Sequence, residues 1–515
     1  MPHDENITPE PSPPTSQDFA EFPPHTMPPH PHIDSATSSD PYELTKEAIQ
    51  DPPITWGETV KYIGPGLILT ASIVGTGELI ATTNLGAKAG FALLWLVVLS
   101  CFIKVFVQIE LGRSAISSGD TTLTSFQRIP KIGDALCWWW FAMMFLSQFQ
   151  IGAMIGGTAQ ALNLAMPWGA QVFSSINPDI SEEAARKAAE IFWAVVVTLV
   201  SIYLLIQGRY TAVERTSTIL VALFTLLTIA VMVLLPFIST NIVPQPAPEG
   251  APEPDSSGLW MAAFAMVGIT GVGASELISY PYWCLEKRYA RFIGPHENTD
   301  SWLARAKGWL RVMHADAWLS MIVYTLATIA FYVLGAAVLF KYTGGRGLSS
   351  GGTGQLLQEL AKMYEPVLGQ KGSIWFIMIG GFIVLYSTLY AATAGNCRVT
   401  TDFLRVQGLV PFSPQAYRIR WIRLLSAWFP LLALGLYLFV QNPVFMVVIG
   451  GVAQALTLPM IAAVAIYVRW KVTDKRLVVR GVWDVLLWIS LVAFTIAAGY
   501  GLWTQRTRID DIFGK

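Results

Sequence analysis

The chain has 515 residues, of which 53% are hydrophobic and only 13% are charged, with a net charge of −1 and a mean hydropathy of +0.48. Soluble globular proteins carry about 25% charged residues, so this composition excludes an ordinary soluble domain. The near-neutral charge gives no reason to expect a nucleic-acid partner, and the four cysteines form no CxxC pair that would indicate a disulfide framework or a zinc site.

Residues 1–50 differ from the rest of the chain, because they are rich in Pro, Ser, Thr, His and acidic residues and contain almost no apolar run. Such a segment cannot bury a core, so we predict a disordered cytoplasmic tail. A basic segment followed by an apolar one is missing, so we do not expect a signal peptide.

Apolar segments long enough to cross about 30 Å of hydrocarbon as helices make up most of the remaining sequence. The pattern predicts an all-α polytopic membrane protein with eleven spans. The predicted spans lie at about 59–84, 90–112, 133–164, 188–207, 213–238, 257–284, 314–341, 372–396, 421–441, 443–469 and 481–503.

Lys and Arg gather in the loops that face the cytoplasm if the N-terminus is cytoplasmic, which fixes the expected orientation. An odd number of spans then places the C-terminal tail, 504–515, outside. We expect the protein to reside in the plasma (inner) membrane. Residues 285–313 are predicted to form a large cytoplasmic loop, and the amphipathic segment 355–364 is either a short outer gating helix or a connector.

Two short strings in the first and sixth spans nearly repeat each other. A carboxylate near the bilayer centre costs about 2.5–3.5 kcal/mol and is typical of a substrate or ion path. Because the two spans run in opposite directions, we predict five-span inverted repeats at 55–238 and 257–469, followed by an extra span at 481–503. The strings are Gly75-Thr76-Gly77-Glu78-Leu79-Ile80 and Gly273-Ala274-Ser275-Glu276-Leu277-Ile278.

The small residues in each string favour an unwound turn near the membrane midplane, because Gly weakens a helix and Thr or Ser can bond the backbone. Such a turn frees carbonyl oxygens and N–H groups beside a cavity. Glu78 and Glu276 could cap the half-helices, bind a cation or carry a proton. Carboxylate and carbonyl oxygens suit Mg²⁺, Ca²⁺ or Mn²⁺, so we assign metal ligation to both glutamates. The predicted substrate site comprises Gly75, Thr76, Gly77, Glu78, Gly273, Ala274, Ser275 and Glu276, together with Lys104 and Gln454.

Lys104 lies inside the second span, where a charged side chain needs a partner. It could neutralise Glu78 or Glu276, bind an anion together with the half-helix N-termini, or snorkel to the inner membrane surface. Three polar side chains at membrane depth, Gln148, Gln150 and Gln454, could serve helix–helix hydrogen bonding or substrate contact.

Several segments in a characteristic order resemble the Nramp (natural resistance-associated macrophage protein) family of divalent-metal transporters, over residues 55–505. The resemblance implies the leucine-transporter-like fold, with the substrate held between broken spans 1 and 6. The segments are Gly75–Trp95, Ala161-Leu162-Asn163-Leu164, Gly268-Ile269-Thr270-Gly271, Ala394-Gly395-Asn396 and Asp402-Phe403-Leu404.

The sequence departs from the family pattern at the metal site. The family has Asp-Pro-Gly-Asn where the string 75–78 stands, and Met-Pro-His where Ser275, Glu276 and Leu277 stand. Ile151 and Met154 replace an acidic pair of the third span. We therefore expect a divergent branch without the family's transition-metal preference, for which hydrated Mg²⁺ is a consistent substrate.

The sequence predicts a secondary transporter or facilitator that moves a divalent cation, such as Mg²⁺ or Mn²⁺, by alternating access. An alternative is a transporter of a small anion or zwitterion that uses Lys104, with the glutamates carrying protons or co-ions. A third is a non-transporting sensor or scaffold that binds partners through its tail and the loop 285–313. No nucleophile–base arrangement or phosphate loop is present in the sequence, so we expect neither an enzyme nor a cofactor.

Overall fold

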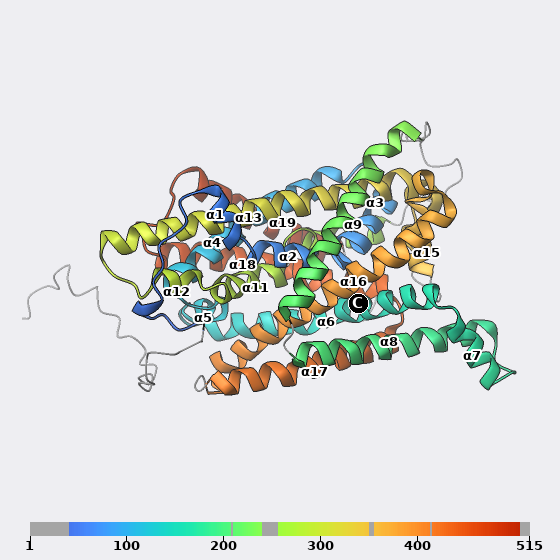
Figure 1. Ribbon diagram of the computed structural model, residues 1–515. Coiled ribbons are helices and arrows are strands. Elements are labelled where there is room, and N and C mark those ends of the chain that lie inside the picture. Colours follow the sequence, from blue (N-terminus) through green and yellow to red (C-terminus); the bar gives the residue numbers. More distant parts are fainter. Residues whose placement is uncertain (1–40, 208–209, 239–255, 350–354, 412–414, 505–515) are drawn as a thin grey trace, which may run out of the picture. The chain divides into compact units, whose positions relative to one another are not determined.

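The computed structural model describes residues 41–207, 210–238, 256–349, 355–411 and 415–504. Every regular element in these ranges is a helix, and most of the long helices lie roughly along a common axis (Figure 1). The predicted tails lie outside the described residues, apart from 41–50 and residue 504.

The first half of the chain builds the predicted spans one to five. Its elements are the 3₁₀ turn η1 (Lys46–Ala48), α1 (Trp56–Tyr62), α2 (Pro65–Ile73), the π-helical turn η2 (Thr76–Thr82), α3 (Thr83–Ala89), α4 (Leu94–Ser118), α5 (Thr122–Gln127), α6 (Gly133–Ala165), α7 (Trp168–Ile176), α8 (Glu182–Gln207) and α9 (Tyr210–Ile238).

The second half builds spans six to eleven. Its elements are α10 (Ser256–Ile269), α11 (Ala274–Glu286), α12 (Tyr289–Ile293), α13 (Asp300–Leu334), the π-helical turn η3 (Gly335–Leu339), α14 (Phe340–Thr343), α15 (Gln355–Lys362), α16 (Glu365–Val406), α17 (Gln415–Val440), α18 (Pro443–Lys471) and α19 (Val482–Thr504).

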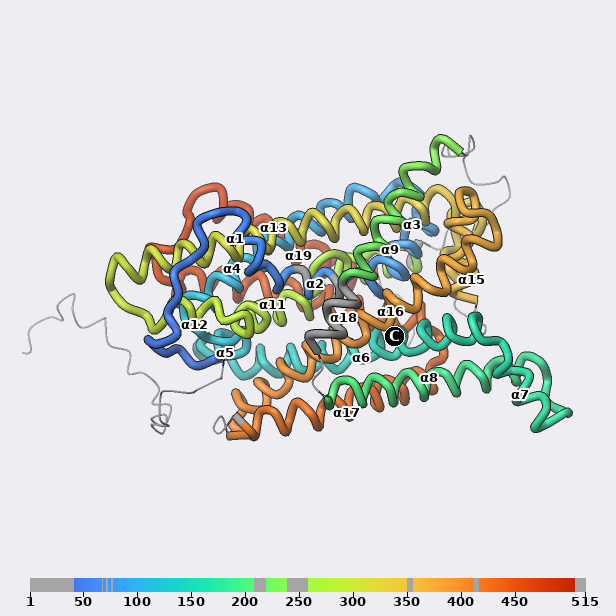
Figure 2. Tube along the Cα trace, viewed as in Figure 1, coloured from blue at the N-terminus to red at the C-terminus, as the bar shows by residue number. Residues whose placement is uncertain are grey.

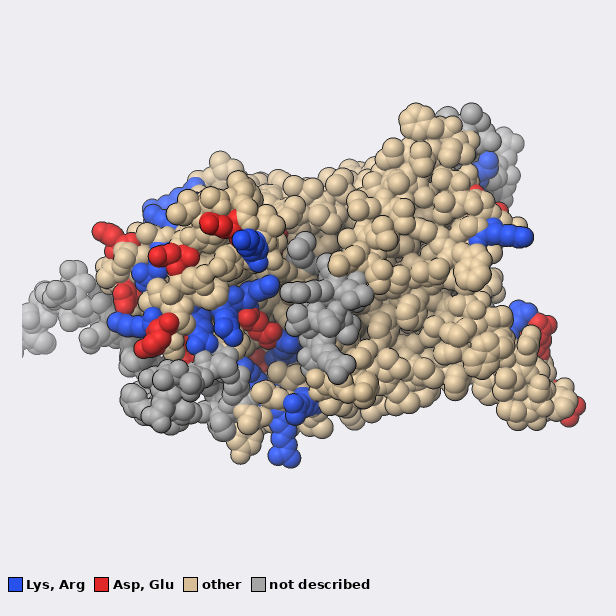
Figure 3. Space-filling view, in the orientation of Figure 1, with Lys and Arg blue, Asp and Glu red and all other residues tan. Residues whose placement is uncertain are grey.

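Nine helical segments in the described ranges are long and apolar enough to cross a membrane. The other two predicted spans are α6, whose mean hydropathy is lowered by Gln148, Gln150 and Gln160, and the first span, which is divided into α2, η2 and α3. Uncharged residues cover the middle of the molecule, whereas charged side chains gather near α1 and α12 (Figure 3). The chain is therefore an integral membrane protein. The predicted bounds of the two repeats, 55–238 and 257–469, stay predictions.

Two short segments test the sequence analysis outside the spans. The prediction of a large loop at 285–313 is wrong, because α12 and the start of α13 occupy most of it. Thr299 begins α13 as an N-cap, since its hydroxyl accepts a hydrogen bond from Trp302 N at 3.2 Å. The amphipathic segment forms α15, which buries Leu356, Leu357 and Leu360 as expected of a short packed helix.

Both predicted breaks are present in the structure. The first span passes from α2 into η2 at Gly75, which packs so closely on Thr388 of α16 that a β-carbon there would collide. The sixth span is unwound between α10 and α11, where Gly271 has a left-handed φ of +63° that favours glycine.

The broken spans lie among the other helices. The tube trace shows α2 beside α11, and the two helices are in contact (Figure 2). α6 packs against α16, α17 and α18, and α13 packs against α2 and α4. This packing surrounds irregular backbone with protein, which is the condition for tolerating it at membrane depth.

Candidate functional site

A polar cavity lies where the two broken spans meet α6, α16 and α18. Glu276 is the only ionisable residue among the described residues that line it, and the other polar lining groups are amides, hydroxyls and backbone. The polar lining residues are Gly77, Ser147, Gln150, Ser275, Glu276, Ser279, Asn396 and Gln454.

Gln454 organises the start of α11. Its Oε1 accepts a hydrogen bond from Ser275 N at 3.1 Å, and its Nε2 donates to Gln150 Oε1 at 2.7 Å. A β-carbon at Gly273 would lie 2.5 Å from Glu276 Oε2 and 2.8 Å from Gln454 Oε1. The structure therefore brings four predicted site residues together, and their oxygens converge beside the backbone of Gly273.

Glu78 lies apart from this cavity. Its side chain is fully buried, and its Oε1 accepts hydrogen bonds from Gly271 N at 3.0 Å and from Thr328 Oγ1 at 3.1 Å. Its Oε2 has no hydrogen-bond donor among the described residues. Glu78 thus caps the unwound segment of the opposite broken span, whereas the capping interpretation from sequence placed it on its own half-helix.

Lys104 is fully buried and donates a hydrogen bond from Nζ to Thr270 O, at 2.6 Å, in the break of the sixth span. Burial of this kind contradicts the snorkelling interpretation. The hydroxyls of Thr82 and Thr270 lie 2.9 Å apart, and this hydrogen bond joins the first span to the break in the sixth span.

The remaining predicted residues take simpler positions. Ala274 is the fully buried first residue of α11, and Gly75 packs on α16. Thr76 lies in η2, and its side chain is outside the described part of the structure.

Sequence reasoning missed several cavity residues, of which Met154 matters most because it brings a sulfur atom to the lining. It follows Gln150 by four residues on α6, so both lie on one face of that helix. This spacing was the signal that could have found it. Ser279 and Asn396 were missed as lining residues as well, although Asn396 belongs to a segment that carries the family resemblance.

A buried aspartate, also missed, holds the start of the first span. Asp316 of α13 accepts hydrogen bonds from Gly64 N at 2.9 Å and Gly66 N at 2.7 Å. The Tyr280 hydroxyl of α11 donates to the same carboxylate at 3.1 Å. Asp316 therefore fastens α2 and α11, the two half-helices on one side of the breaks, to α13.

A second buried network joins three helices away from the cavity. Arg469 of α18 lies 2.7 Å from Glu110 of α4 and 2.8 Å from Asp484 of α19, and Arg113 lies 3.0 Å from Glu110. These ion pairs compensate charges buried among the helices, and none of the four residues lines the cavity.

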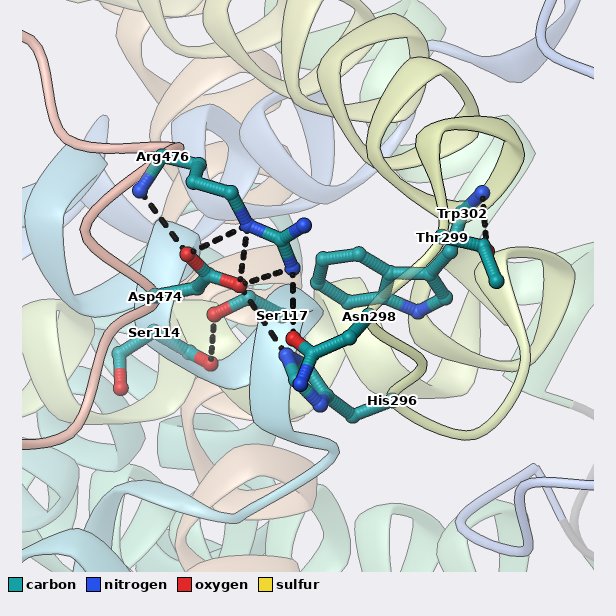
Figure 4. A network of polar contacts seen from close by, with 8 residues as sticks. All are labelled: Ser114, Ser117, His296, Asn298, Thr299, Trp302, Asp474 and Arg476. Atoms are coloured by element: carbon teal, nitrogen blue, oxygen red, sulfur yellow. Dashed lines mark hydrogen bonds and ion pairs between the residues drawn. The ribbon is translucent and has the colours of Figure 1, made fainter. Parts of the chain in front are cut away.

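A further polar network lies outside the membrane-spanning segments, on the loop between α18 and α19 (Figure 4). Asp474 Oδ2 lies 2.7 Å from Arg476 Nη2 and 3.1 Å from His296 Nε2. Hydrogen bonds from Arg476 hold the pKa of Asp474 well below its usual value. In the described residues, no group of three or more His, Cys, Asp or Glu side chains could hold a metal ion.

Comparison with known proteins gives consistent results. The model of the natural resistance-associated macrophage protein-like family matches residues 66–504. An uncharacterized protein of Pasteurella multocida is 21% identical over 479 residues, which cover 90% of this chain and 95% of that protein.

Solved structures share the fold at low sequence identity. A mutant of the Eremococcus coleocola manganese transporter is 15% identical, with 92% of this chain and 93% of that chain covered and a TM-score of 0.57. MhsT in complex with L-phenylalanine is 16% identical, with 88% and 99% covered and a TM-score of 0.52. The fold is therefore leucine-transporter-like, with two inverted five-span repeats and an eleventh helix, as predicted.

Proposed function

Since the chain belongs to the natural resistance-associated macrophage protein-like (Nramp) family, we propose that it moves a divalent metal cation across the membrane. It acts as a secondary transporter or facilitator that works by alternating access. The substrate lies in the cavity between the broken spans, with the N-terminus in the cytoplasm and the C-terminal tail outside.

The observation that carries this proposal is the composition of the cavity wall. Glu276 supplies its only charge among the described residues, and amide and hydroxyl groups supply most of its other polar contacts. Hard oxygen donors of this kind prefer hard divalent cations. The manganese transporter of Eremococcus coleocola, which shares the fold, supports the same substrate class.

Within that class we favour Mg²⁺ over Mn²⁺. Mg²⁺ keeps several of its waters and is usually held through one or two carboxylates, which suits a cavity with a single acidic lining residue. Met154 is the one sulfur-bearing side chain among the described lining residues, and a thioether contributes little to binding of either ion.

The two glutamates have different roles in this proposal. Glu276 contacts the ion directly or through water, because it lines the cavity beside Gln454 and Gly273. Glu78 acts on the site indirectly, because its Oε1 accepts hydrogen bonds from Gly271 N and Thr328 and so holds the break of the sixth span in place. The alternative of an anion or zwitterion substrate needs Lys104 at the cavity, and Lys104 instead bonds Thr270 O on the other side of the break.

Calorimetric titration of the purified full-length protein with MgCl₂ and MnCl₂ tests the site. We expect Glu276→Gln to weaken binding of both ions at least about tenfold, the effect of losing about 1.4 kcal/mol. Glu190→Gln is the control, because Glu190 is a glutamate within a membrane-spanning helix that does not line the cavity. Unchanged binding by Glu276→Gln, or cation uptake into liposomes that survives Glu78→Gln and Glu276→Gln together, would reject the assignment.

A further inference from the structure

Outside the lining of the cavity, the two breaks carry the oxygen ligands of a small cation site. The unwound segment presents the carbonyl of Thr270, and Glu78 presents a carboxylate. The Thr328 hydroxyl donates to Glu78 Oε1, and the Thr82 hydroxyl bonds the hydroxyl of Thr270. All four residues are fully buried. Unwound carbonyls and a carboxylate are the groups with which discontinuous spans hold Na⁺ or H⁺.

This position already contains a positive charge. Lys104 reaches it from α4, which is neither of the broken spans, and its Nζ lies 2.6 Å from Thr270 O. A buried ammonium at membrane depth pairs with acidic groups or with backbone carbonyls. Glu78 and Glu276 are the acidic groups whose charges act on Lys104, and Glu78 is the one whose carboxylate bonds the same unwound segment.

Two unpartnered polar atoms in the same neighbourhood indicate that it is built for an ion. Glu78 Oε2 and the Tyr324 hydroxyl are buried and lack hydrogen-bond partners among the described residues. Both residues contact Gly271, because Glu78 Oε1 accepts from its N–H and a β-carbon there would lie 3.1 Å from the Tyr324 ring. A buried oxygen without a donor is costly unless a positive charge lies near it.

We propose that the Lys104 ammonium is a resident monovalent cation, tethered to α4, which fills an ion position formed by Glu78 and the unwound backbone at Thr270. The transporter consequently needs no Na⁺ or K⁺ as a co-ion, and removal of the lysine side chain opens a site for either ion. The statement about transport rests on the proposed function, whereas the statement about the ion position does not.

The test compares the wild-type protein with Lys104→Ala in NaCl, KCl and choline chloride at equal ionic strength. Two readouts are needed, namely the thermal unfolding midpoint of the purified protein and Mg²⁺ uptake into liposomes. We expect the wild type to behave alike in all three salts. The variant should be stabilised by Na⁺ or K⁺ relative to choline, and its uptake should fall about tenfold in choline and recover in Na⁺ or K⁺.

Ser100→Ala is the matched control, because Ser100 is buried on α4 one turn before Lys104, and this variant should show no salt response. If Lys104→Ala does not fold, the double variant Glu78→Gln with Lys104→Met removes both charges and should show no response to Na⁺ or K⁺. The proposal is overturned if the wild type requires Na⁺ or K⁺. It is also overturned if Lys104→Ala folds but does not respond to Na⁺ or K⁺, or if the double variant does respond. If the wild type shows no Mg²⁺ uptake while Na⁺ still stabilises Lys104→Ala, only the proposed function is rejected.

Discussion

The two broken spans carry nearly the same six residues, yet their glutamates lie in different surroundings. Glu78 lies in the π-helical turn η2, where Gly271 N and Thr328 hold one of its oxygens and protein encloses it completely. Glu276 lies in the first turn of α11, is partly exposed and lines the cavity. The difference comes from the neighbouring spans, because α13 and the sixth-span break supply donors to Glu78, whereas α6 and α18 leave a cavity beside Glu276.

This comparison teaches that an inverted repeat can divide two tasks between matching residues. The enclosed glutamate holds the breaks together and balances Lys104, and the cavity glutamate remains available to a ligand. The division predicts that substitutions at one break change stability and that substitutions at the other change binding.

The largest effect should come from Glu78→Ala. Removing one partner from a buried group of charges leaves the other uncompensated, so the free energy of unfolding should fall by about 3–5 kcal/mol. Glu276→Ala is the matched substitution at the other break and should cost less than about 1 kcal/mol, because the side chain is partly exposed. Denaturant unfolding in detergent measures both, and equal losses would contradict the division of tasks.

The next largest effect should come from Gly273→Ala, which changes only the cavity side. The new methyl group would lie 2.5 Å from Glu276 Oε2 and 2.8 Å from Gln454 Oε1 and would push these oxygens apart. Since these two oxygens belong to the proposed ion site, we expect Mg²⁺ affinity to fall about tenfold, a loss of about 1.4 kcal/mol, in calorimetric titration.

Gly435→Ala is the control for that experiment, because no atom lies within 4 Å of a β-carbon at Gly435 in α17. It should leave Mg²⁺ affinity unchanged and stabilise the helix slightly. If Gly273→Ala binds Mg²⁺ as tightly as this control, the converging oxygens beside Gly273 are not the ion site.

Gln454→Leu should have a smaller effect on the same side. It removes the acceptor for Ser275 N and the donor to Gln150 Oε1, and each lost hydrogen bond contributes about 0.5–1.5 kcal/mol. We expect unfolding at lower denaturant concentration together with a several-fold loss of Mg²⁺ affinity. Gln148→Leu is the control, because Gln148 bonds only within its own helix among the described residues, and a loss as large in this variant would contradict the role of Gln454.

The sequence predicted the spans and the breaks because both depend on local properties. Long apolar runs require membrane helices, and Gly75 and Gly273 weaken the helix where the structure shows it broken. The long loop expected at 285–313 was wrong because a polar helix extending from the membrane does not differ from a loop in hydropathy alone.

The separation of the two glutamates could not be predicted in the same way. Which oxygen Gly271 N binds depends on contacts between spans far apart in sequence, and no local pattern specifies them. Three buried carboxylates could have been found from the sequence, because each is an ionisable residue within a predicted span. They are Glu110, Glu190 and Asp316.

The smallest loss of stability should come from Asp474→Asn. This variant tests whether burial or hydrogen bonding causes the large loss expected for Glu78→Ala. Asp474 Oδ1 accepts from Arg476 N at 2.9 Å, and Oδ2 accepts from Arg476 Nη2 at 2.7 Å, so it is at least as well bonded as Glu78. The side chains of Arg476 and Asp474 are, however, 35% and 14% exposed, whereas Glu78 is fully buried. Exposed ion pairs contribute about 0–1 kcal/mol, so Asp474→Asn should lower the free energy of unfolding by no more than that.

The pH dependence gives this prediction its sign. Arg476 lowers the pKa of Asp474 in the folded protein, so its contribution is fully present above the unfolded value of about 3.9 and is lost as the pH falls toward the lower folded value. The difference in stability between the wild type and Asp474→Asn should therefore shrink as the pH falls below about 4. Lys475→Ala, at the next position, should show no such change. If Asp474→Asn lowers the free energy of unfolding at neutral pH as much as Glu78→Ala does, burial is not the cause of the large Glu78 effect. The number of hydrogen bonds would then explain it.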